Sequence, residues 1–312
     1  MSISDPDHLA AALLDAQVEY LRLGPEPFVA TLTAIDLGPV RLQIAADHAH
    51  ISRGSVASDR FVLMVGLNLT EERALLNGVQ IRQRDVVHLG PGAPVIARIV
   101  APIEWGALSI RADAMQAALP AESIPQDEKF LLHQDCAAHS ALAGLMREAG
   151  IMARRDPARF SLSSVRKAMA EDALRFSMAA VGHPPWMDAS FRAVQRRVAL
   201  VRQMEAFLAS RMHEPVYSED LQQALGVPML TLHNAVVALH GMSVHRYLRL
   251  RRLHLARAAL LSGGRSVSHV KIAALSYGFW HLGRFAQDYR ELFGELPSDT
   301  IAYGNNIHAS AV

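Results

Sequence analysis

The stretch IAALSYGFWHLGRFAQDYRELFGELP, residues 272–297, decides the architecture of the C-terminal part of this 312-residue chain. A short helix is predicted over Ser268–Ser276, and it ends near Gly278, because glycine has the backbone freedom that a tight turn needs. A second helix is predicted from about His281 to Phe293. Two short helices joined by a glycine-containing turn form a helix-turn-helix, whose second helix can enter the major groove of DNA.

A related unit, SEDLQQALGVPMLTLHNAVVALHGMS, lies about fifty residues upstream. The matching positions are Ser218 and Ser268 at candidate N-caps, Gly226 and Gly278 in the turns, and Gly241 and Gly294 after the second helices. A long arginine-rich helix is predicted between the units, from Ser243 to about Leu261. It would span roughly 28 Å, close to the roughly 34 Å between successive major grooves. One chain could therefore place two recognition helices in neighbouring grooves.

These residues resemble the AraC/XylS-type bacterial transcription regulators over about Val198–Ala302. The positions that match the linker helix of the family are Tyr247-Leu248, Arg252-Leu253, Ala256 and Leu260. The positions that match its C-terminal signature are Ile272-Ala273, Gly278-Phe279, Phe285, Phe293-Gly294 and Pro297. The string GFWHLGRFAQDY is similar to the branch that contains the ethanolamine-utilisation operon regulator.

The resemblance implies that the early part of each second helix reads DNA bases. The implied base contacts are Thr231, His233 and Asn234 in the first unit, and His281, Gly283, Arg284 and Gln287 in the second. Arginine pairs with guanine, and asparagine and glutamine pair with adenine. Trp280 is expected at the rim of this surface. The side chains expected to face the core are Leu230, Leu232, Val236, Leu282, Phe285 and Tyr289. The candidate phosphate contacts are Arg249, Lys271 and Arg290.

The charge is uneven along the chain, although the net charge is only +1. From Phe191 onward there are 14 Lys and Arg against 8 Asp and Glu, a net of +6. This surplus coincides with the helix-turn-helix units, where phosphates would need neutralising. The single Cys136 excludes an internal disulfide and a thiolate zinc cage. We expect a cytoplasmic protein with no membrane span, because no long apolar run or signal-peptide pattern is present.

The N-terminal half reads as β-structure. Short runs rich in Val and Ile are separated by Gly and Pro turns and occupy residues 28–35, 40–45, 61–69, 86–90 and 95–100. A cupin-like, jelly-roll-like domain is predicted. Two helices follow over Asp127–Gly150 and Ser161–Val181, the second with Ser161 as its N-cap. They would either make dimer contacts or cover the open face of the sheet.

The predicted fold class is therefore α+β. A β-rich effector or sensor domain occupies residues 1–126, and a helical pair, a candidate for dimerisation, occupies residues 127–181. A linker over residues 182–190 leads to an all-α DNA-binding domain over residues 191–312, with two helix-turn-helix units joined by a long helix.

The sequence Asp47-His48-Ala49-His50 has metal-like spacing, because His-x-His on a strand puts both imidazoles on one face. The further ligands of an enzymatic cupin are missing, so we predict no metal, no cofactor and no catalysis. Arg53 is a candidate for holding an anionic ligand. Cys136 is expected to be a core residue.

The sequence predicts a DNA-binding transcription regulator that acts on promoter or operator DNA. The family resemblance implies homodimers, a small-molecule effector, and activation through RNA polymerase. Two alternatives remain open at this point. One is a metal-dependent cupin-type enzyme with an accessory DNA-binding domain. The other is an interaction module whose helix-turn-helix units have decayed.

Overall fold

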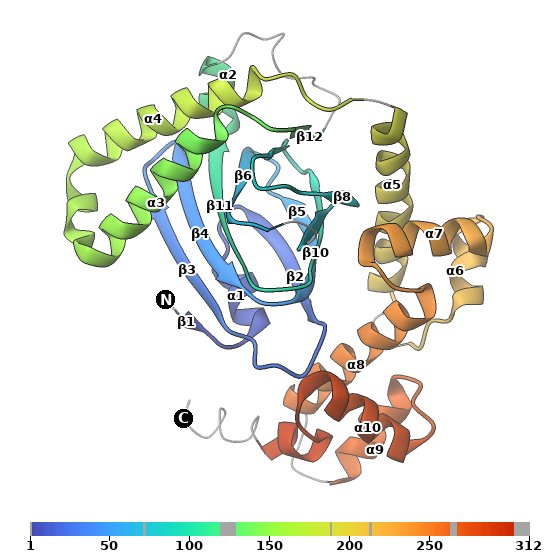
Figure 1. Ribbon diagram of the computed structural model, residues 1–312. Coiled ribbons are helices and arrows are strands. Elements are labelled where there is room, and N and C mark those ends of the chain that lie inside the picture. The colour runs from blue at the N-terminus through green and yellow to red at the C-terminus, as the bar shows by residue number, and fades with distance from the viewer. Residues whose placement is uncertain are drawn as a thin grey trace. The chain divides into compact units, whose positions relative to one another are not determined.

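The structure, a computed structural model, describes residues 2–70, 73–118, 129–187, 189–211, 214–262 and 267–302. The chain divides into two compact units (Figure 1). The first comprises Met1–Tyr20 and Phe28–Gln195, and the second comprises Leu21–Pro27 and Arg196–Val312. A β-rich N-terminal region and a helical C-terminal region confirm the predicted α+β class. The finer division at residues 126, 181 and 190 stays a prediction, as does the cupin-like topology.

Two β-sheets form the first unit. The seven-stranded sheet has the order β1 (Ser2–Ile3), β3 (Ala30–Asp36), β4 (Val40–Asp47), β11 (Ile103–Arg111), β6 (Arg60–Asn68), β9 (Val86–Leu89) and β12 (Phe130–His133). The five-stranded sheet has the order β2 (Ala16–Arg22), β5 (His50–Val56), β10 (Pro94–Ile99), β7 (Ala74–Leu76) and β8 (Val79–Gln80). Every neighbouring pair of the larger sheet is antiparallel. All five predicted runs correspond to strands, namely β3, β4, β6, β9 and β10.

The helix predicted over Asp127–Gly150 is wrong in its first part. Phe130–His133 forms β12, which pairs antiparallel with β9, and the helix begins only at His139. All four residues of β12 are buried, so a place at the edge of the sheet prevails over local helical periodicity. Asp127 and Glu128 lie outside the described residues.

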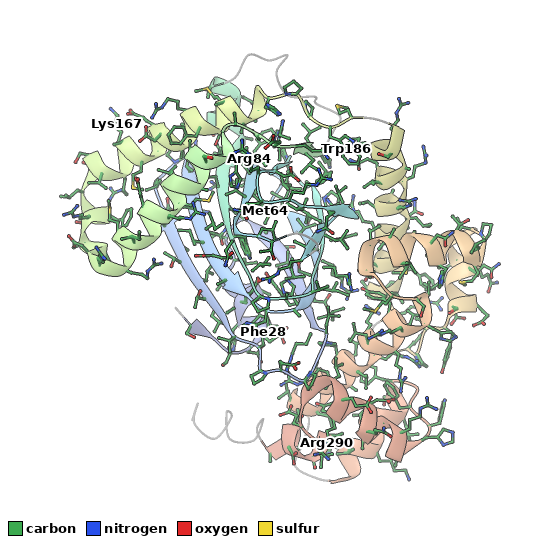
Figure 2. All side chains as sticks on the ribbon, in the orientation of Figure 1. Phe28, Met64, Arg84, Lys167, Trp186 and Arg290 are labelled. Atoms are coloured by element: carbon green, nitrogen blue, oxygen red, sulfur yellow. The ribbon has the colours of Figure 1, made fainter. Side chains whose placement is uncertain are left out.

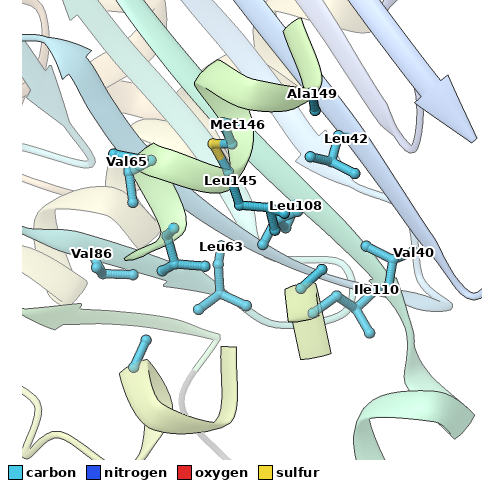
Figure 3. Close-up of a cluster of buried hydrophobic side chains, with 14 of the residues drawn as sticks. Val40, Leu42, Leu63, Val65, Val86, Leu108, Ile110, Leu145, Met146 and Ala149 are labelled. Carbon is cyan, nitrogen blue, oxygen red and sulfur yellow. The ribbon is translucent and has the colours of Figure 1, made fainter. Parts of the chain in front are cut away.

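Three helices pack on one face of the seven-stranded sheet. Figure 3 shows part of the buried cluster that they form with it. The three helices are α2 (Ala112–Ala118), α3 (His139–Arg155) and α4 (Ser163–Val181). Leu63, Leu108 and Met146 are each fully buried in this layer. A Cβ added at Gly106 would lie 2.0 Å from Sδ of Met146, so glycine at this position lets α3 approach β11 closely. The helical pair therefore covers the sheet, one of the two roles predicted for it, and dimerisation through it stays a prediction.

The predicted N-cap of α4 is wrong. Ser161 ends the 3-10 helix η1 (Pro157–Ser161), and Leu162 occupies the N-cap position of α4. The Ser161 hydroxyl donates instead to the carbonyl oxygen of Ala158 at 2.7 Å. The short helix α1 (Pro6–Ala12) does have a side-chain cap, because Asp5 accepts a hydrogen bond from the amide of Asp7.

His88 is buried in the first unit without a hydrogen-bond partner for either ring nitrogen among the described residues. It lies on β9, and its ring centroid is 5.6 Å from that of Phe61 and 6.2 Å from that of His133. Burial, and to a smaller extent His133, lower the pKa of His88 to about 4. His88 is therefore neutral at neutral pH, and protonating it would place an unpaired charge in the core.

The long elements of regular structure described in the second unit are helices. They are α5 (Ala189–Ala209), whose first residues belong to the first unit, α6 (Ser218–Leu225), α7 (Met229–His240), α8 (Val244–Ser262), α9 (Val267–Ser276) and α10 (Leu282–Phe293). No helix among the described residues has the length and apolar character needed to cross a bilayer.

Candidate nucleic-acid interface

Four glycines with left-handed backbone end the helices of two similar units. Gly226 and Gly241 follow α6 and α7 with φ of 62° and 64°. Gly278 and Gly294 follow α9 and α10 with φ of 76° and 75°. Residues with a Cβ pay a steric cost in this conformation, which explains glycine at these four matched positions. The pairs α6–α7 and α9–α10 are thus short helices that end at glycines, and their action as two helix-turn-helix units stays a prediction.

The predicted N-caps of the two units differ from the structure. Tyr217 occupies the N-cap position of α6, and Ser218 is its first residue. The carboxylate of Asp220 accepts a hydrogen bond from the Tyr217 amide at 2.8 Å, as in a capping box. Ser268 lies inside α9, and residues 263–266, which precede this helix, are outside the described part of the chain. The acidic residue at the third helical position thus takes the capping role predicted for a serine.

Within the helical part of the chain, the turn between α9 and α10 packs against the residues that precede α6. A Cβ added at Gly278 would lie 2.9 Å from Cβ of Pro215, 3.0 Å from Nη1 of Arg252 and 3.1 Å from the Tyr217 hydroxyl. Arg252, on α8, places its guanidinium 5.4 Å from the ring centroid of Tyr217 and 5.3 Å from that of Phe279. A cation placed over an aromatic ring in this way is attracted to it. Arg252 therefore joins the long helix to both helix-turn-helix units.

The helix α7 buries one stripe and exposes the opposite one. Leu232, Val236 and Leu239 are fully buried. Of the predicted base contacts, Thr231 and Asn234 are exposed and His233 is half-buried. Leu230 was expected to face the core, and that prediction is wrong, because its side chain is 70% exposed. The reason is periodicity, since two residues are about 200° apart around a helix and Leu230 therefore lies opposite Leu232.

The helix α10 has the same division of faces. Phe285, Tyr289 and Phe293 are buried, and the Tyr289 hydroxyl lies 2.7 Å from Oγ1 of Thr300. Leu282 was expected in this core but is 39% exposed, because it begins the helix where few residues cover it.

The predicted base contacts of the second unit share the exposed face of α10. His281, Gly283, Arg284 and Gln287 are all exposed, with His281 at the N-cap position of the helix. Arg284 has no ion-pair partner among the described residues, whereas Gln287 donates from Nε2 to Oε1 of Glu291 at 2.9 Å. The arrangement leaves a guanidinium on a convex helix surface, free to meet an acceptor.

The three predicted phosphate contacts have different surroundings. Lys271 and Arg290 are exposed, the latter on α10 (Figure 2). Arg249 differs, because its guanidinium forms an ion pair with Asp288 of α10. This pairing connects α8 to the second recognition helix and offsets the charge of Arg249. No spacing in the sequence indicated it, since the two residues are 39 positions apart.

Exposed apolar side chains are the feature that the sequence interpretation missed at this surface. Leu230, Ile272 and Trp280 are 70%, 58% and 69% exposed. Only Trp280 was expected near the rim. An offset from the buried positions of each helix would have identified the other two.

The histidine pair of the first unit is not arranged on a strand as expected. His48 lies in the turn between β4 and β5, and only His50 belongs to a strand. Each ring is held by a backbone carbonyl, because Nδ1 of His48 is 2.6 Å from the Val29 oxygen and Nδ1 of His50 is 2.7 Å from the His48 oxygen. Within the described ranges, no three His, Cys, Asp or Glu side chains gather as a metal site.

Arg53 and Cys136 also have defined surroundings. Arg53 forms an ion pair with Glu19, with 2.7 Å between Nη2 and Oε2. The predicted anion-binding role therefore competes with an intramolecular carboxylate. Cys136 is buried in the core beneath α3, as expected, and burial raises the pKa of its thiol.

The interior of the first unit contains a cavity of about 130 Å³ between the two sheets. Strands of both sheets line it, and most of its lining side chains are apolar. Four buried polar residues take part in the lining: Gln43, Asp47, His50 and Ser52. Like the exposed faces of α7 and α10, this cavity is a place where a ligand can meet side-chain functional groups.

Comparison with known proteins identifies the C-terminal part. Residues 221–302 match the family described as "Helix-turn-helix domain". The XylDLEGF operon transcriptional activator of Pseudomonas putida is 37% identical over 95 residues, which is 30% of this chain and 30% of the relative. The XylDLEGF operon transcriptional activator 1 of the same organism is 49% identical over 61 residues, 20% of this chain and 18% of the relative.

A solved structure gives a similar match. A probable AraC family transcriptional regulator from Rhodopseudomonas palustris CGA009 is 36% identical, with 34% of this chain and 97% of that chain covered and a TM-score of 0.31. The chain matches less than a third of the length of each of these two relatives. The match to the helix-turn-helix family and the two activators of Pseudomonas putida support the AraC/XylS resemblance and a DNA-binding helix-turn-helix domain. The narrower similarity to the branch of the ethanolamine-utilisation regulator stays a prediction.

Proposed function

We propose that this protein is a sequence-specific transcription regulator of the AraC/XylS type that inserts α7 and α10 into adjacent major grooves. The observation that carries the proposal is the connection between the two helix-turn-helix units, α6–α7 and α9–α10. Gly278 packs on Pro215 and Tyr217, while Arg252 of α8 contacts Tyr217 and Phe279. Because these contacts hold the units together, the two recognition helices would bind as one body over a helix of about 28 Å.

In this proposal Arg284 reads a guanine and Asn234 reads an adenine. Thr231, His233, His281 and Gln287 supply further polar contacts. Gly283 allows the backbone to approach DNA closely. The fold itself does not require glycine there, since a Cβ at Gly283 would meet nothing within 4 Å.

Lys271 and Arg290 contact phosphates in this proposal, because both are exposed cations. Arg249 acts mainly through Asp288 and positions α10. The assignment thus separates cations that meet DNA from cations that stabilise the domain.

The first unit senses a small-molecule effector through its cavity and takes part in dimerisation. Effector binding activates transcription through contacts with RNA polymerase in the cytoplasm, and no catalytic step is involved. The relatives' description as transcriptional activators supports activation over repression.

The experiment that tests this function is selection of bound sequences from a random duplex pool by the full chain. The expected result is a site with two major-groove segments about ten base pairs apart. Affinity for that site should fall steeply between two salt concentrations, because cations on the protein release counterions from DNA. Failure to enrich any sequence would refute the proposal and favour an interaction module.

A further inference from the structure

The cavity of the first unit is of a size that fits one small ring. Its volume is about 130 Å³. An engineered apolar cavity of roughly 150 Å³ in another protein binds benzene. Alternate residues of β10, namely Val95, Ala97 and Ile99, point their side chains to this space, as expected for one face of a strand. The body of a ligand here would be apolar and no larger than about one ring.

One polar atom at the cavity lacks a partner. Asp47 is 2% exposed, and its Oδ2 accepts a hydrogen bond from Nε1 of Trp105 at 3.2 Å. Its Oδ1 is buried and has no hydrogen-bond partner among the described residues. A buried acceptor without a partner is costly, so a donor that reaches it gains free energy.

Two of the neighbouring polar residues already have hydrogen-bond partners in the protein. The side-chain amide of Gln43 donates to the Leu14 carbonyl and accepts from the Leu14 amide, both at 2.9 Å. Nδ1 of His50 donates to the carbonyl of His48. The contrast identifies Asp47 as the group that the fold leaves for a ligand.

The electrostatics of the cavity favour a cation over an anion. Burial raises the pKa of the Asp47 carboxyl, and burial together with the charge of Asp47 raises the pKa of Tyr20. Among the described residues that line the cavity, Asp47 and Glu104 are carboxylates and none is lysine or arginine. A carboxylate ligand would therefore face like charge, whereas an ammonium group would stabilise ionised Asp47.

We propose that the cavity binds a small primary amine with an apolar, ring-sized body, whose ammonium group donates to Oδ1 of Asp47. This inference rests on the proposed function, in which the cavity holds the effector. It adds the chemical class of that effector and the residue that selects it. The apolar body would be held by the strand residues of both sheets.

The test is calorimetric titration of the full chain with benzylamine, benzyl alcohol, toluene and benzoate. Benzylamine should bind roughly 10- to 100-fold more tightly than toluene, the gain of one charge-assisted hydrogen bond. Benzyl alcohol should fall between them, and benzoate should bind most weakly. Equal or tighter binding of benzoate, or no binding of benzylamine, would overturn the proposal.

Three variants make the test specific. Asp47→Asn should remove most of the preference for benzylamine and leave toluene binding unchanged, which also shows that the cavity is intact. Ala97→Leu should weaken both by filling the space. Asp172→Asn makes the same chemical change in a surface ion pair with Arg175 and should alter neither. Undiminished benzylamine binding by Asp47→Asn would refute the role of Asp47.

Duplex selection without ligand keeps the two proposals apart. Loss of the amine preference with an enriched duplex would refute only this inference. Benzylamine binding without any enriched duplex would refute only the regulator function.

Discussion

Replacing Gly278 by alanine should destabilise the helical unit much more than the same change at Gly226. Both residues have left-handed backbone, with φ of 76° and 62°, so each substitution costs about 1–2 kcal/mol of backbone strain. A Cβ at Gly226 would meet nothing within 4 Å, whereas a Cβ at Gly278 would lie 2.9 Å from Cβ of Pro215. Carbon atoms prefer about 3.5–4.0 Å, and overpacking of this kind typically costs about 1–3 kcal/mol.

Comparing Gly278→Ala with Gly226→Ala therefore isolates the contact between the two helix-turn-helix units. The expected free-energy losses are about 1–2 kcal/mol for Gly226→Ala and about 2–5 kcal/mol for Gly278→Ala. Urea unfolding of the full chain, followed by far-ultraviolet circular dichroism, measures both. Gly278→Ala should also weaken binding to a selected two-groove duplex, because Pro215, Tyr217 and Arg252 must shift. Equal losses for the two variants would refute the reasoning that this contact holds the units together.

Three further predictions concern the recognition surface and the first unit. Arg284→Ala should lose about 1–3 kcal/mol of DNA-binding free energy and relax specificity at one base pair. Arg290→Ala should weaken binding to all duplexes alike and lower the salt slope of binding by about 1. Quantitative binding to single-base variants of the selected site separates the two outcomes. The pKa of His88 is about 4 in the folded chain against an ordinary 6.5, so the unfolded chain takes up the proton first as the pH falls. The contribution of neutral His88 to stability is therefore fully present above about pH 6.5, and the free energy of unfolding falls by up to about 3 kcal/mol towards pH 4. Urea midpoints across this pH range should show a smaller acid loss for His88→Leu, and an unchanged slope would contradict the assignment. Gly144→Ala, in α3 with nothing within 4 Å of the added Cβ, should raise the unfolding free energy by about 0.5–1 kcal/mol, which a lowered thermal midpoint would contradict.

The short helices of the C-terminal part and their glycine ends could be predicted from sequence because their signals are local. A glycine in left-handed backbone ends a helix whatever surrounds it, so Gly226, Gly241, Gly278 and Gly294 mark the turns directly. The buried stripe of α10 likewise follows from helical spacing. Errors arose at helix starts, because Leu230 lies opposite the buried Leu232 and Leu282 begins its helix where few residues cover it.

The first unit resisted prediction where its structure depends on distant residues. Phe130–His133 is a strand only because β9, more than forty residues earlier, offers an edge to pair with. Trp105, 58 positions after Asp47, donates a hydrogen bond to only one of the two carboxylate oxygens and leaves the other without a partner among the described residues. Periodicity within a window cannot represent such pairings, and propensity is a weak guide when packing decides.

The arginines of α8 show why a basic composition does not measure contact with DNA. Arg249 is paired with Asp288, Arg257 with Glu295, and Arg252 is held between two aromatic rings. Each of these cations contacts other residues of the same domain. Each links α8 to a residue of a helix-turn-helix unit or of the segment that follows it. The count of 14 Lys and Arg in this part of the chain therefore overstates the number of phosphates it can neutralise. The same contacts explain what these arginines do instead: they fasten α8 to the helices on either side of it, and the proposed spacing of α7 and α10 on DNA depends on that attachment.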